Sequence, residues 1–227
     1  NGNGHILFNF RISKNNIYNG FFGYTSGATI QNVGFEDYEI DISSYSSNTY
    51  VGGIAGYTTN NTTIKNCYTT CNITISASDS SFAGGIIGYS YNTNVKYCYS
   101  TGDITTHSTI EYDNNGYADY ACAGGIVGKS YNNTTIKHSY SLGNITAKMT
   151  NLNYGNQTYN WANSICTGES NIANCYYTSN QIIIQGSDTI HVNEDSLNTI
   201  YSLISNNWDK NIWNIYDNQN PKLIKKH

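Results

Sequence analysis

The apolar and polar positions of this chain repeat in blocks rather than in helical turns. A glycine-rich block of the form Gly-Gly-Ile-x-Gly-Tyr recurs at residues 20–24, 52–57, 84–89 and 124–129. A worn copy with fewer glycines lies near Ser164. Each of the four clear copies is followed by a short polar segment rich in Ser, Thr and Asn, which is typical of a turn. The repeat anchors therefore fall near residues 20, 53, 85, 125 and 164.

A second block follows each glycine block and carries one aliphatic position, at Ile30, Ile64, Val95, Ile136 and Ile172. A third block, Gly-x-Ile-Thr, occurs at residues 102–105 and 143–146. Short runs of Ile, Val, Thr and Tyr between Gly, Asn and Ser predict strands. One coil of three such strands cannot bury its own apolar side, so successive coils must stack. We therefore expect an all-β fold over residues 1–180, a parallel β-solenoid of the right-handed β-helix type.

Stacking in register predicts columns of equivalent residues. The aliphatic positions form a buried ladder, and a second ladder holds small residues at Val33, Cys67, Cys98, Ser139 and Cys175. An aromatic ladder is expected at Tyr68, Tyr99, Tyr140 and Tyr176. The paired glycines are expected at a tight bend, where a Cβ would clash or φ must be positive.

Residues 181–227 break the repeat. The segment Asp195–Asn206 places Leu197, Ile200 and Ile204 at helical spacing, which predicts a short helix. Trp208 and Trp213 follow in a short aromatic stretch. Because a solenoid must hide its last open edge, we expect this segment to be a C-terminal cap.

Composition narrows the class of protein. Only 11% of the 227 residues are charged, the formal net charge is −4, and Tyr (22) and Gly (21) are abundant. Clustered cations are too few for a nucleic-acid binder. No run of 18 apolar residues is present, so no membrane span is expected in this segment. The chain begins inside a pattern without Met, and we expect it to be a piece of a longer protein.

The repeat resembles a known family. Gly-Gly-Ile-x-Gly-Tyr, followed by Ile-Lys-Asn-Cys-Tyr as at residues 64–68, is similar to the GLUG repeat over roughly residues 20–178. The resemblance implies a large secreted or wall-attached bacterial protein, such as an adhesin or the non-catalytic N-terminal region of an immunoglobulin-A-cleaving metallopeptidase. It implies no catalytic motif and no cofactor. The first copy, with Phe21-Phe22, and the worn copy near Ser164 depart from the pattern.

Acidic side chains are the first candidates for a ligand site. Asp37, Glu39 and Asp41 alternate, so they share one face of a strand. The longest repeat interval contains an excursion, Thr106–Tyr120, that carries Glu111, Asp113 and Asp119. Loops of this kind often carry the specificity of a solenoid. Carboxylates in either place could bind Ca²⁺ or perform acid–base chemistry on a glycosidic bond, whereas a solvated acidic face is the plainer interpretation.

Cysteine and asparagine give weaker signals. Cys67 and Cys98 lie one coil apart in one column, so a disulfide and a pair of stacked buried thiols both fit, and we favour the thiols. No spacing of Cys and His predicts a metal site. Glycosylation sequons occur among others at Asn61, Asn72, Asn133, Asn144 and Asn156.

The first expectation for the function is a non-catalytic extracellular or cell-surface module, and two further functions stay open. That module would be an adhesin or stalk segment that binds a glycan or a host or cell-surface protein through loops between the repeats. The alternatives are a carbohydrate-active solenoid enzyme and a subunit of an extracellular filament that associates end to end.

Overall fold

The structure is a computed structural model of the chain. It describes residues 1–45, 48–110, 119–151, 158–177, 182–185, 188–191, 208–215 and 219–224. The side chains of residues 110, 119, 151, 158, 182–185 and 188–191 are not among those described. The predicted helix Asp195–Asn206 lies outside the described residues. No described segment is helical, and thus none forms a helix long and apolar enough to cross a membrane.

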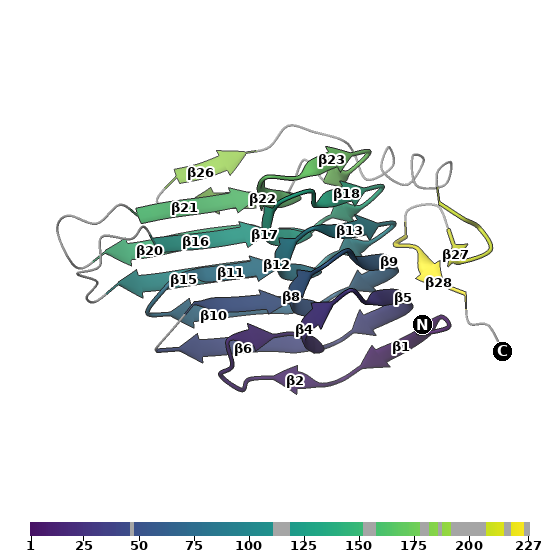
Figure 1. Ribbon diagram of the computed structural model, residues 1–227, viewed down its shortest axis with the longest axis horizontal. Helices are drawn as coiled ribbons and strands as arrows, with labels where there is room; N and C mark the ends of the chain where they lie inside the picture. Colours follow the sequence, from purple (N-terminus) through teal and green to yellow (C-terminus); the bar gives the residue numbers. More distant parts are fainter. Residues whose placement is uncertain are drawn as a thin grey trace.

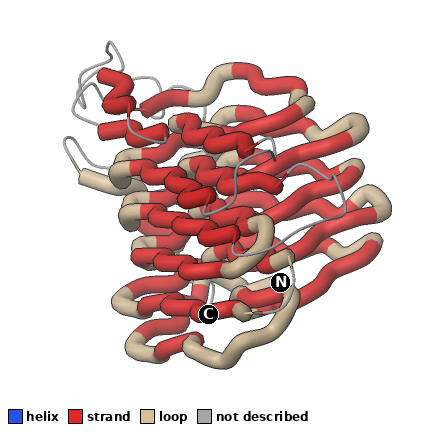
Figure 2. Tube along the Cα trace, turned by 90° about the vertical axis from the view of Figure 1, so that its left-hand side faces the viewer, coloured by secondary structure: helices blue, strands red, loops and turns tan. Residues whose placement is uncertain are grey.

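The strands stack coil upon coil into an all-β parallel solenoid, as expected (Figures 1 and 2). Each complete coil contributes to four sheets rather than the three expected. The additional strand directly precedes the paired glycines, as Thr49–Gly52 does before Gly53. Its sequence varies from coil to coil, and for that reason the repeat pattern does not reveal it. We number the sheets in the order in which a coil visits them.

The first and second sheets hold five strands each. The first sheet contains β3 (Tyr18–Asn19), β7 (Thr49–Gly52), β11 (Ser81–Gly84), β16 (Asp119–Gly124) and β21 (Thr158–Asn163). The second sheet contains β4 (Phe22–Ser26), β8 (Ala55–Thr59), β12 (Ile87–Tyr91), β17 (Val127–Tyr131) and β22 (Cys166–Gly168).

The third and fourth sheets each begin with a strand that precedes β3 in the chain. The third contains β1 (His5–Phe8), β5 (Thr29–Glu36), β9 (Thr62–Thr69), β13 (Thr93–Lys96), β14 (Tyr99–Ser100), β18 (Thr135–Lys137), β19 (Tyr140–Ser141), β23 (Asn171–Ala173) and β24 (Tyr176–Tyr177). The fourth contains β2 (Arg11–Ile12), β6 (Glu39–Ser44), β10 (Asn72–Ala77), β15 (Ile104–Ile110), β20 (Ile145–Asn151), β25 (Ile182–Gln185) and β26 (Asp188–His191).

Neighbouring coils pair in parallel and nearly in register, so equivalent residues of the repeat face each other. Ile30 pairs with Ile64, Ile64 with Val95, and Val95 with Ile136, which confirms the buried aliphatic ladder in these four coils. Ile172 pairs with Ile136 but is 43% exposed, so the last member of the ladder is not buried. This ladder and the isoleucines of the fourth sheet, such as Ile40 and Ile73, fill the narrow interior of the solenoid. The fourth sheet continues in parallel past residue 180 to β25, which then pairs antiparallel with β26.

The paired glycines are required because the coils stack closely there. A Cβ on Gly53 would lie 2.3 Å from Gly85 O, and one on Gly85 would lie 2.3 Å from Gly125 O. Neither glycine has a positive φ. The bend therefore needs glycine for space and not for a left-handed backbone, so only the first of the two expected reasons holds here.

Left-handed backbone occurs instead at two asparagine-rich turns. One turn holds Asn60 and Asn61 in the second coil and Asn132 and Asn133 in the fourth, all with φ between 45° and 60°. The other turn lies in the third sheet, where Asn32, Asn66, Tyr97, His138 and Asn174 occupy one left-handed column. Asn tolerates this conformation better than most residues, and this explains part of the unusual Asn content.

The C-terminal segment packs on the side of the stack. The strap, by which we mean residues 208–215 and 219–224, forms the antiparallel pair β27 (Trp213–Asn214) and β28 (Lys222–Leu223). Trp208, Trp213 and Leu223 are buried against the outward rings of Tyr68, Tyr99 and Tyr140 on the third sheet. Figure 1 shows β27 and β28 beside the stack, at the end near β5 and β9. The strap, which is one described part of the predicted cap, therefore covers a side face, whereas β25 and β26 continue the fourth sheet beyond β20.

The first coil leaves part of the interior uncovered. Beneath the first coil, the third and fourth sheets each have one more strand, β1 and β2. The first and second sheets begin with β3 and β4 and have no strand below them. A hollow of about 430 Å³ results, with Leu7, Phe21, Phe22 and Ile30 among its lining residues. Phe21 and Phe22 are 41% and 37% exposed, so the departure from the glycine pattern in this copy places two aromatic rings at the open end.

Candidate functional site

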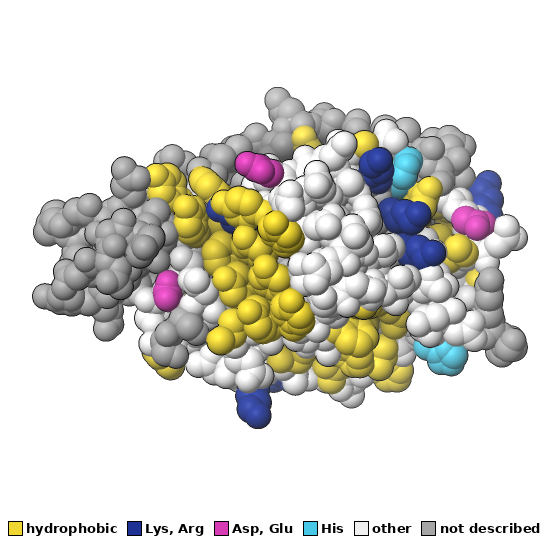
Figure 3. All heavy atoms as spheres, viewed as in Figure 1, with side chains coloured by type: hydrophobic (Ala, Val, Ile, Leu, Met, Phe, Trp, Pro, Cys, Tyr) yellow, Lys and Arg dark blue, Asp and Glu magenta, His cyan; other side chains and the backbone are white. Residues whose placement is uncertain are grey.

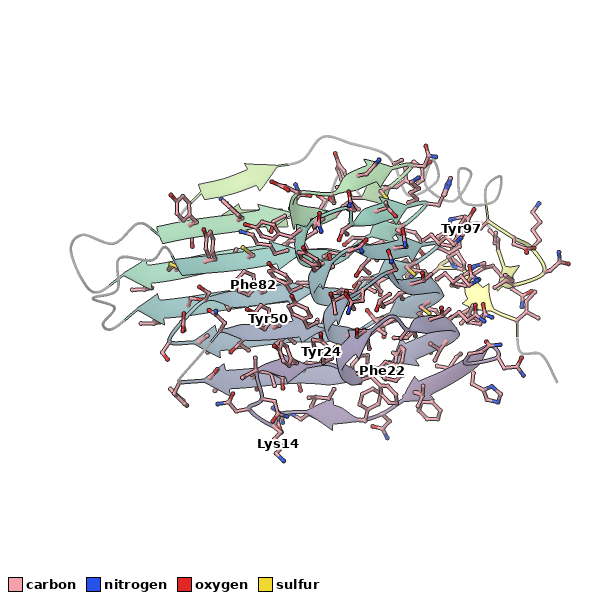
Figure 4. All side chains as sticks on the ribbon, in the orientation of Figure 1. Lys14, Phe22, Tyr24, Tyr50, Phe82 and Tyr97 are labelled. Carbon is pink, nitrogen blue, oxygen red and sulfur yellow. The ribbon has the colours of Figure 1, made fainter. Side chains whose placement is uncertain are left out.

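Two columns of aromatic rings run up the outer surface of the first and second sheets. Tyr18, Tyr50 and Phe82 pair in register on the first sheet. Tyr24, Tyr57 and Tyr89 pair in register on the second. We call these six residues the aromatic band. Figure 3 shows apolar side chains gathered there in a vertical stripe, and Figure 4 shows Tyr24, Tyr50 and Phe82 one above another.

The rings of the band pack against one another both within and between the two columns. Within a column they stack face to face, with centroids 5.0 Å apart for Tyr50 and Phe82 and 5.1 Å apart for Tyr57 and Tyr89. Between columns they meet edge to face, at 5.6 Å for Tyr50 and Tyr57 and 5.5 Å for Phe82 and Tyr89. Both arrangements suit the ring quadrupole. The band is thus a rigid, preformed surface.

The columns meet because the corner between the two sheets is re-entrant. Outward side chains of neighbouring sheets can touch only when the sheets bend toward each other on the outside. Glycine permits this bend: a Cβ on Gly56 would lie 2.6 Å from Asn19 N, and one on Gly88 would lie 2.5 Å from Val51 N. The last glycine of the block thus brings the two sheets together and allows the two columns of rings to meet.

The band lies at the surface but is partly shielded. Tyr24 is 52% exposed and Tyr18 is 36% exposed, whereas Phe82 is buried. Burial raises the pKa of Tyr50 to about 12, and neighbouring phenols add to the shift. Burial and the adjacent tyrosines also raise the pKa of Tyr57 and Tyr89. These phenols therefore remain neutral hydrogen-bonding groups at physiological pH.

Lys129 takes the place of the tyrosine in the fourth coil and ends the second-sheet column, since it pairs with Tyr89. It is only 3% exposed, and its ammonium lies 4.0 Å from the centroid of Tyr120 and 3.8 Å from that of Trp161. Burial lowers the pKa of Lys129, and the nearby Cys122 opposes the shift. Contact with two ring faces partly compensates for the loss of water around the charge.

The acidic run Asp37, Glu39 and Asp41 lies apart from the band, on and beside β6. Arg11 pairs with both carboxylates of the strand, at 3.0 Å from Asp41 and 3.8 Å from Glu39. Both pairs are more than 40% exposed. Asp37 occupies a left-handed turn with φ of 49°. A solvated, partly neutralised face describes this run better than a catalytic pair.

The predicted excursion is shorter than expected. Residues Thr106–Ile110 belong to β15, and Asp119 and Tyr120 open β16. Glu111 and Asp113 lie outside the described residues, and for Asp119 only the backbone is described. Among the described residues no group of three or more His, Cys, Asp or Glu side chains could hold a metal ion.

The cysteines are free thiols in the structure. The three in the small-residue ladder have equivalent surroundings: each thiol lies near the carbonyl two residues before it in the chain and near the carbonyl of the aliphatic ladder one coil below. Cys67 Sγ lies 3.8 Å from Ile30 O, Cys98 Sγ 3.7 Å from Ile64 O, and Cys175 Sγ 3.4 Å from Ile136 O. This repeated contact gives the column a structural role.

The sequons fall at turns and strand starts. Asn61 and Asn133 are exposed and lie in the left-handed turns. Asn72 opens β10, and its side chain accepts a hydrogen bond from Asp103 N at 2.9 Å. Asn144 is half-buried between coils, and Asn156 lies outside the described residues. The left-handed backbone accounts for the Asn residues of the two turns, so glycosylation is not needed to explain why Asn occurs there.

Sequence reasoning missed the aromatic band. Only the tyrosine after the last glycine of the block repeats visibly, at Tyr24, Tyr57 and Tyr89. The partner column at Tyr18, Tyr50 and Phe82 sits in the unrecognised strand. Alignment of the positions two before each paired glycine, where an aromatic residue stands in the first three coils, would have provided the signal.

Comparison with known proteins supports the repeat assignment. The GLUG motif matches residues 47–74, 80–105 and 119–146. The fold is similar to the crystal structure of a protein named as an immunoglobulin A1 protease from Bacteroides ovatus. The two share 20% sequence identity with a TM-score of 0.66 over all of this chain and 77% of that one. No curated protein matches the sequence. The three matches are consecutive and each corresponds to one complete coil, so the chain contains GLUG repeats between residues 47 and 146.

Proposed function

We propose that this chain is a non-catalytic, extracellular surface module of adhesin type that binds a neutral glycan along the aromatic band. The band carries the proposal, because it is a continuous stripe of outward aromatic rings that reaches the surface, whereas the outward rings of Tyr68, Tyr99 and Tyr140 are buried under the strap. A preformed surface loses little conformational entropy when it binds a ligand.

The way in which the rings pack defines the type of contact. Because they stack on one another, they present edges and hydroxyls to solvent rather than open faces. Tyrosine combines an apolar body with a polar tip. Such a surface suits a polymer whose units alternate apolar C–H patches with hydroxyl groups. The six rings carry no charge that could pair with an anionic sugar, so we expect a neutral one.

A non-catalytic role fits the placement of the carboxylates. Glycoside hydrolysis generally needs an acid and a base that flank one bond. Glu39 and Asp41 instead share Arg11 on an exposed strand. No carboxylate takes part in the ring contacts of the band. Binding without chemistry therefore needs the fewest additional assumptions.

An extracellular location follows from the resemblance to GLUG-repeat proteins and from the fold shared with a protein named as an immunoglobulin A1 protease. Rigid stacked coils would hold the band at a distance from a cell wall. The proposal places binding on a sheet corner, and not on the loops between repeats that sequence reasoning favoured.

A glycan array followed by calorimetry tests the proposal. We expect the chain to bind one or more neutral glycans and a double variant, Tyr57→Ser with Tyr89→Ser, to bind at least tenfold more weakly. Tyr45→Ser is the matched control, because Tyr45 is 81% exposed and lies outside the band. No neutral glycan bound by the wild-type chain, or equal loss in the control, would refute the proposal. Release of reducing sugar by the wild-type chain would show an enzyme instead.

A further inference from the structure

A row of lysines stands on the outer face of the third sheet. Lys65, Lys96 and Lys137 pair in register in three successive coils. Lys96 and Lys137 are exposed, and Lys65 is half-buried. Adjacent strands lie about 4.8 Å apart, so the three cations repeat at that interval along the stack. Figure 3 shows basic side chains gathered in a row on this face.

No described acidic side chain forms an ion pair with the three lysines. Ion pairs among the described residues join Arg11 to Glu39 and Asp41, and Lys222 to Glu36. The positions that flank the row in its column are Gln31 below and Ala173 above. Like charges directly opposite each other in a sheet repel. The row therefore carries an electrostatic cost in the free chain that an anionic ligand would remove.

The columns on either side of the lysines are polar or planar. On one side stand Thr63, Asn94 and Thr135, and Thr135 Oγ1 donates to Asn94 Oδ1 at 2.8 Å. On the other side Tyr97 and His138 stack with centroids 5.0 Å apart. Figure 4 shows Tyr97 at this end of the molecule, toward the strap. Hydroxyl and amide groups thus lie beside each cation.

We propose that this face binds a linear acidic polysaccharide built from uronic acids, with one carboxylate per coil held by the lysine row. A sugar unit spans roughly the separation between coils, so a chain that follows the stack would bring successive carboxylates to successive lysines. The Thr and Asn column would meet the sugar hydroxyls. This face is separate from the aromatic band and would bind a second, charged class of glycan.

Charge spacing favours a polyuronate over nucleic acid. A duplex strand carries a phosphate every 3.4 Å or so, which does not match an interval of about 4.8 Å. Three cations on a chain with net charge −4 are also few for a nucleic-acid site. A lysine ammonium is a point charge and lacks the paired, planar donors of an arginine guanidinium. Selectivity must therefore come from the spacing of the three cations rather than from bidentate hydrogen bonds.

Binding of polygalacturonate across a series of salt concentrations tests the proposal. We compare the wild-type chain with a triple variant, Lys65→Gln, Lys96→Gln and Lys137→Gln. The matched control is Lys14→Gln, Lys148→Gln and Lys210→Gln, because it changes the net charge equally at exposed lysines that are not part of the row. We expect at least tenfold weaker binding and a flatter salt dependence in the first variant alone. A third variant with Arg at the three row positions should retain binding.

Several results would overturn the proposal. They are no binding by the wild-type chain, equal loss in both Gln variants, or binding of single- or double-stranded DNA as tight as that of polygalacturonate. Circular dichroism of each variant establishes that it is folded. The Tyr57→Ser, Tyr89→Ser variant should bind polygalacturonate normally, so this proposal and that for the aromatic band can fail separately.

Discussion

A single β-carbon decides whether these coils can stack. In the column Gly53, Gly85 and Gly125, each added Cβ would collide with a carbonyl of the next coil. The worn copy places Ser164 in this column. Its strands β21 and β22 are the last of their sheets among the described residues. With no described coil stacked on them, a Cβ meets no such carbonyl, and this explains why the glycine pattern relaxes there.

Gly85→Ala should therefore destabilise the fold by about 2–3 kcal/mol, the usual cost of overpacking. The new Cβ would lie 2.3 Å from both Gly125 O and Ser100 Oγ. Urea unfolding at neutral pH provides the measurement. Gly27→Asn is the matched control, because Gly27 has φ of 61° and open space, and Asn60 takes the equivalent turn in the next coil. A control change within about 0.5 kcal/mol is expected, and equal loss in both variants would contradict the stacking argument.

The buried thiols should be unreactive in the native state. Burial raises the pKa of Cys98 well above its ordinary value, and burial raises that of Cys71 to about 12. The thiolate is the reactive form, so a disulfide reagent at pH 8 should label these cysteines only after denaturation. Cys175 is half-buried and should react first. An intact mass two hydrogens lower per cysteine pair, before reduction, would show that Cys67 and Cys98 form a disulfide instead.

At the scale of elements, the strands predicted from the repeat are those that carry a similar residue at the same position in every coil. The ladders at Ile64 and Tyr68 were visible because every coil needs a similar side chain at those places. The strand before the paired glycines was not visible, since its buried positions accept Val51, Ala83 and Ala123 alike. Small and medium apolar residues fill that narrow part of the interior equally well, so no motif marks it.

The strap could not be placed from sequence, because its partners lie far away in the chain. Tyr99 donates to Pro221 O at 2.8 Å, and Tyr140 donates to Asn220 Oδ1 at 3.2 Å. Lys222 reaches Glu36 in the first coil at 2.5 Å. Residues 220, 221 and 222 thus contact the fourth, third and first coils in turn, so this part of the strap runs back toward the first coil.

Acid should loosen the strap. Burial raises the pKa of Glu36, but hydrogen bonds from Lys222 and Tyr68 and the charge of Lys222 outweigh it, so the pKa falls below its ordinary value of 4.5. A carboxylate with a lowered folded pKa stabilises the folded state above the unfolded pKa. That contribution is lost as pH falls through the folded pKa. Tryptophan fluorescence should therefore report increasing exposure of Trp208 and Trp213 below about pH 4.5.

Glu36→Gln is the control for this pH dependence. It keeps the shape and a hydrogen-bond acceptor for Tyr68 but removes the charge that pairs with Lys222. The fluorescence change below pH 4.5 should become smaller in the variant, and the strap should be looser already at pH 7. An unchanged acid transition would show that another group controls the docking of the strap.

At the scale of the whole molecule, the aromatic band is a product of the four-sheet geometry. In the sequence the tyrosine after the glycine block repeats, at Tyr24, Tyr57 and Tyr89, but nothing there places it on the outer surface or gives it a second column to face. The band needs the re-entrant corner at Gly56 and Gly88, and this corner exists only because an additional strand precedes the bend. A site made where two sheets meet cannot be read from one repeat alone.

The stack is close to one-dimensional, because each coil contacts mainly its neighbours, and stability should be nearly a sum over coils. The strap is the exception, since it ties the first coil to the fourth. Excision of residues 81–120 joins Ser80 to Ala121, which is the register partner of Ser81. The shortened chain would keep a continuous solenoid but bring Glu36 and Tyr140 closer by about 4.8 Å. Asn220 and Lys222 could then no longer reach both partners.

We therefore expect the cost of excision to depend on the strap. In the full chain, removal of the coil should lower the free energy of unfolding by more than it does in a chain that lacks residues 208–227. The difference, a coupling energy, should be about 1–3 kcal/mol, as for other groups that share partners. Urea unfolding of the four chains measures it, and circular dichroism should retain its β signal in each. A coupling near zero would mean that the strap adapts to a shorter stack, and that its contacts with Tyr140 and Glu36 do not fix the number of coils it spans.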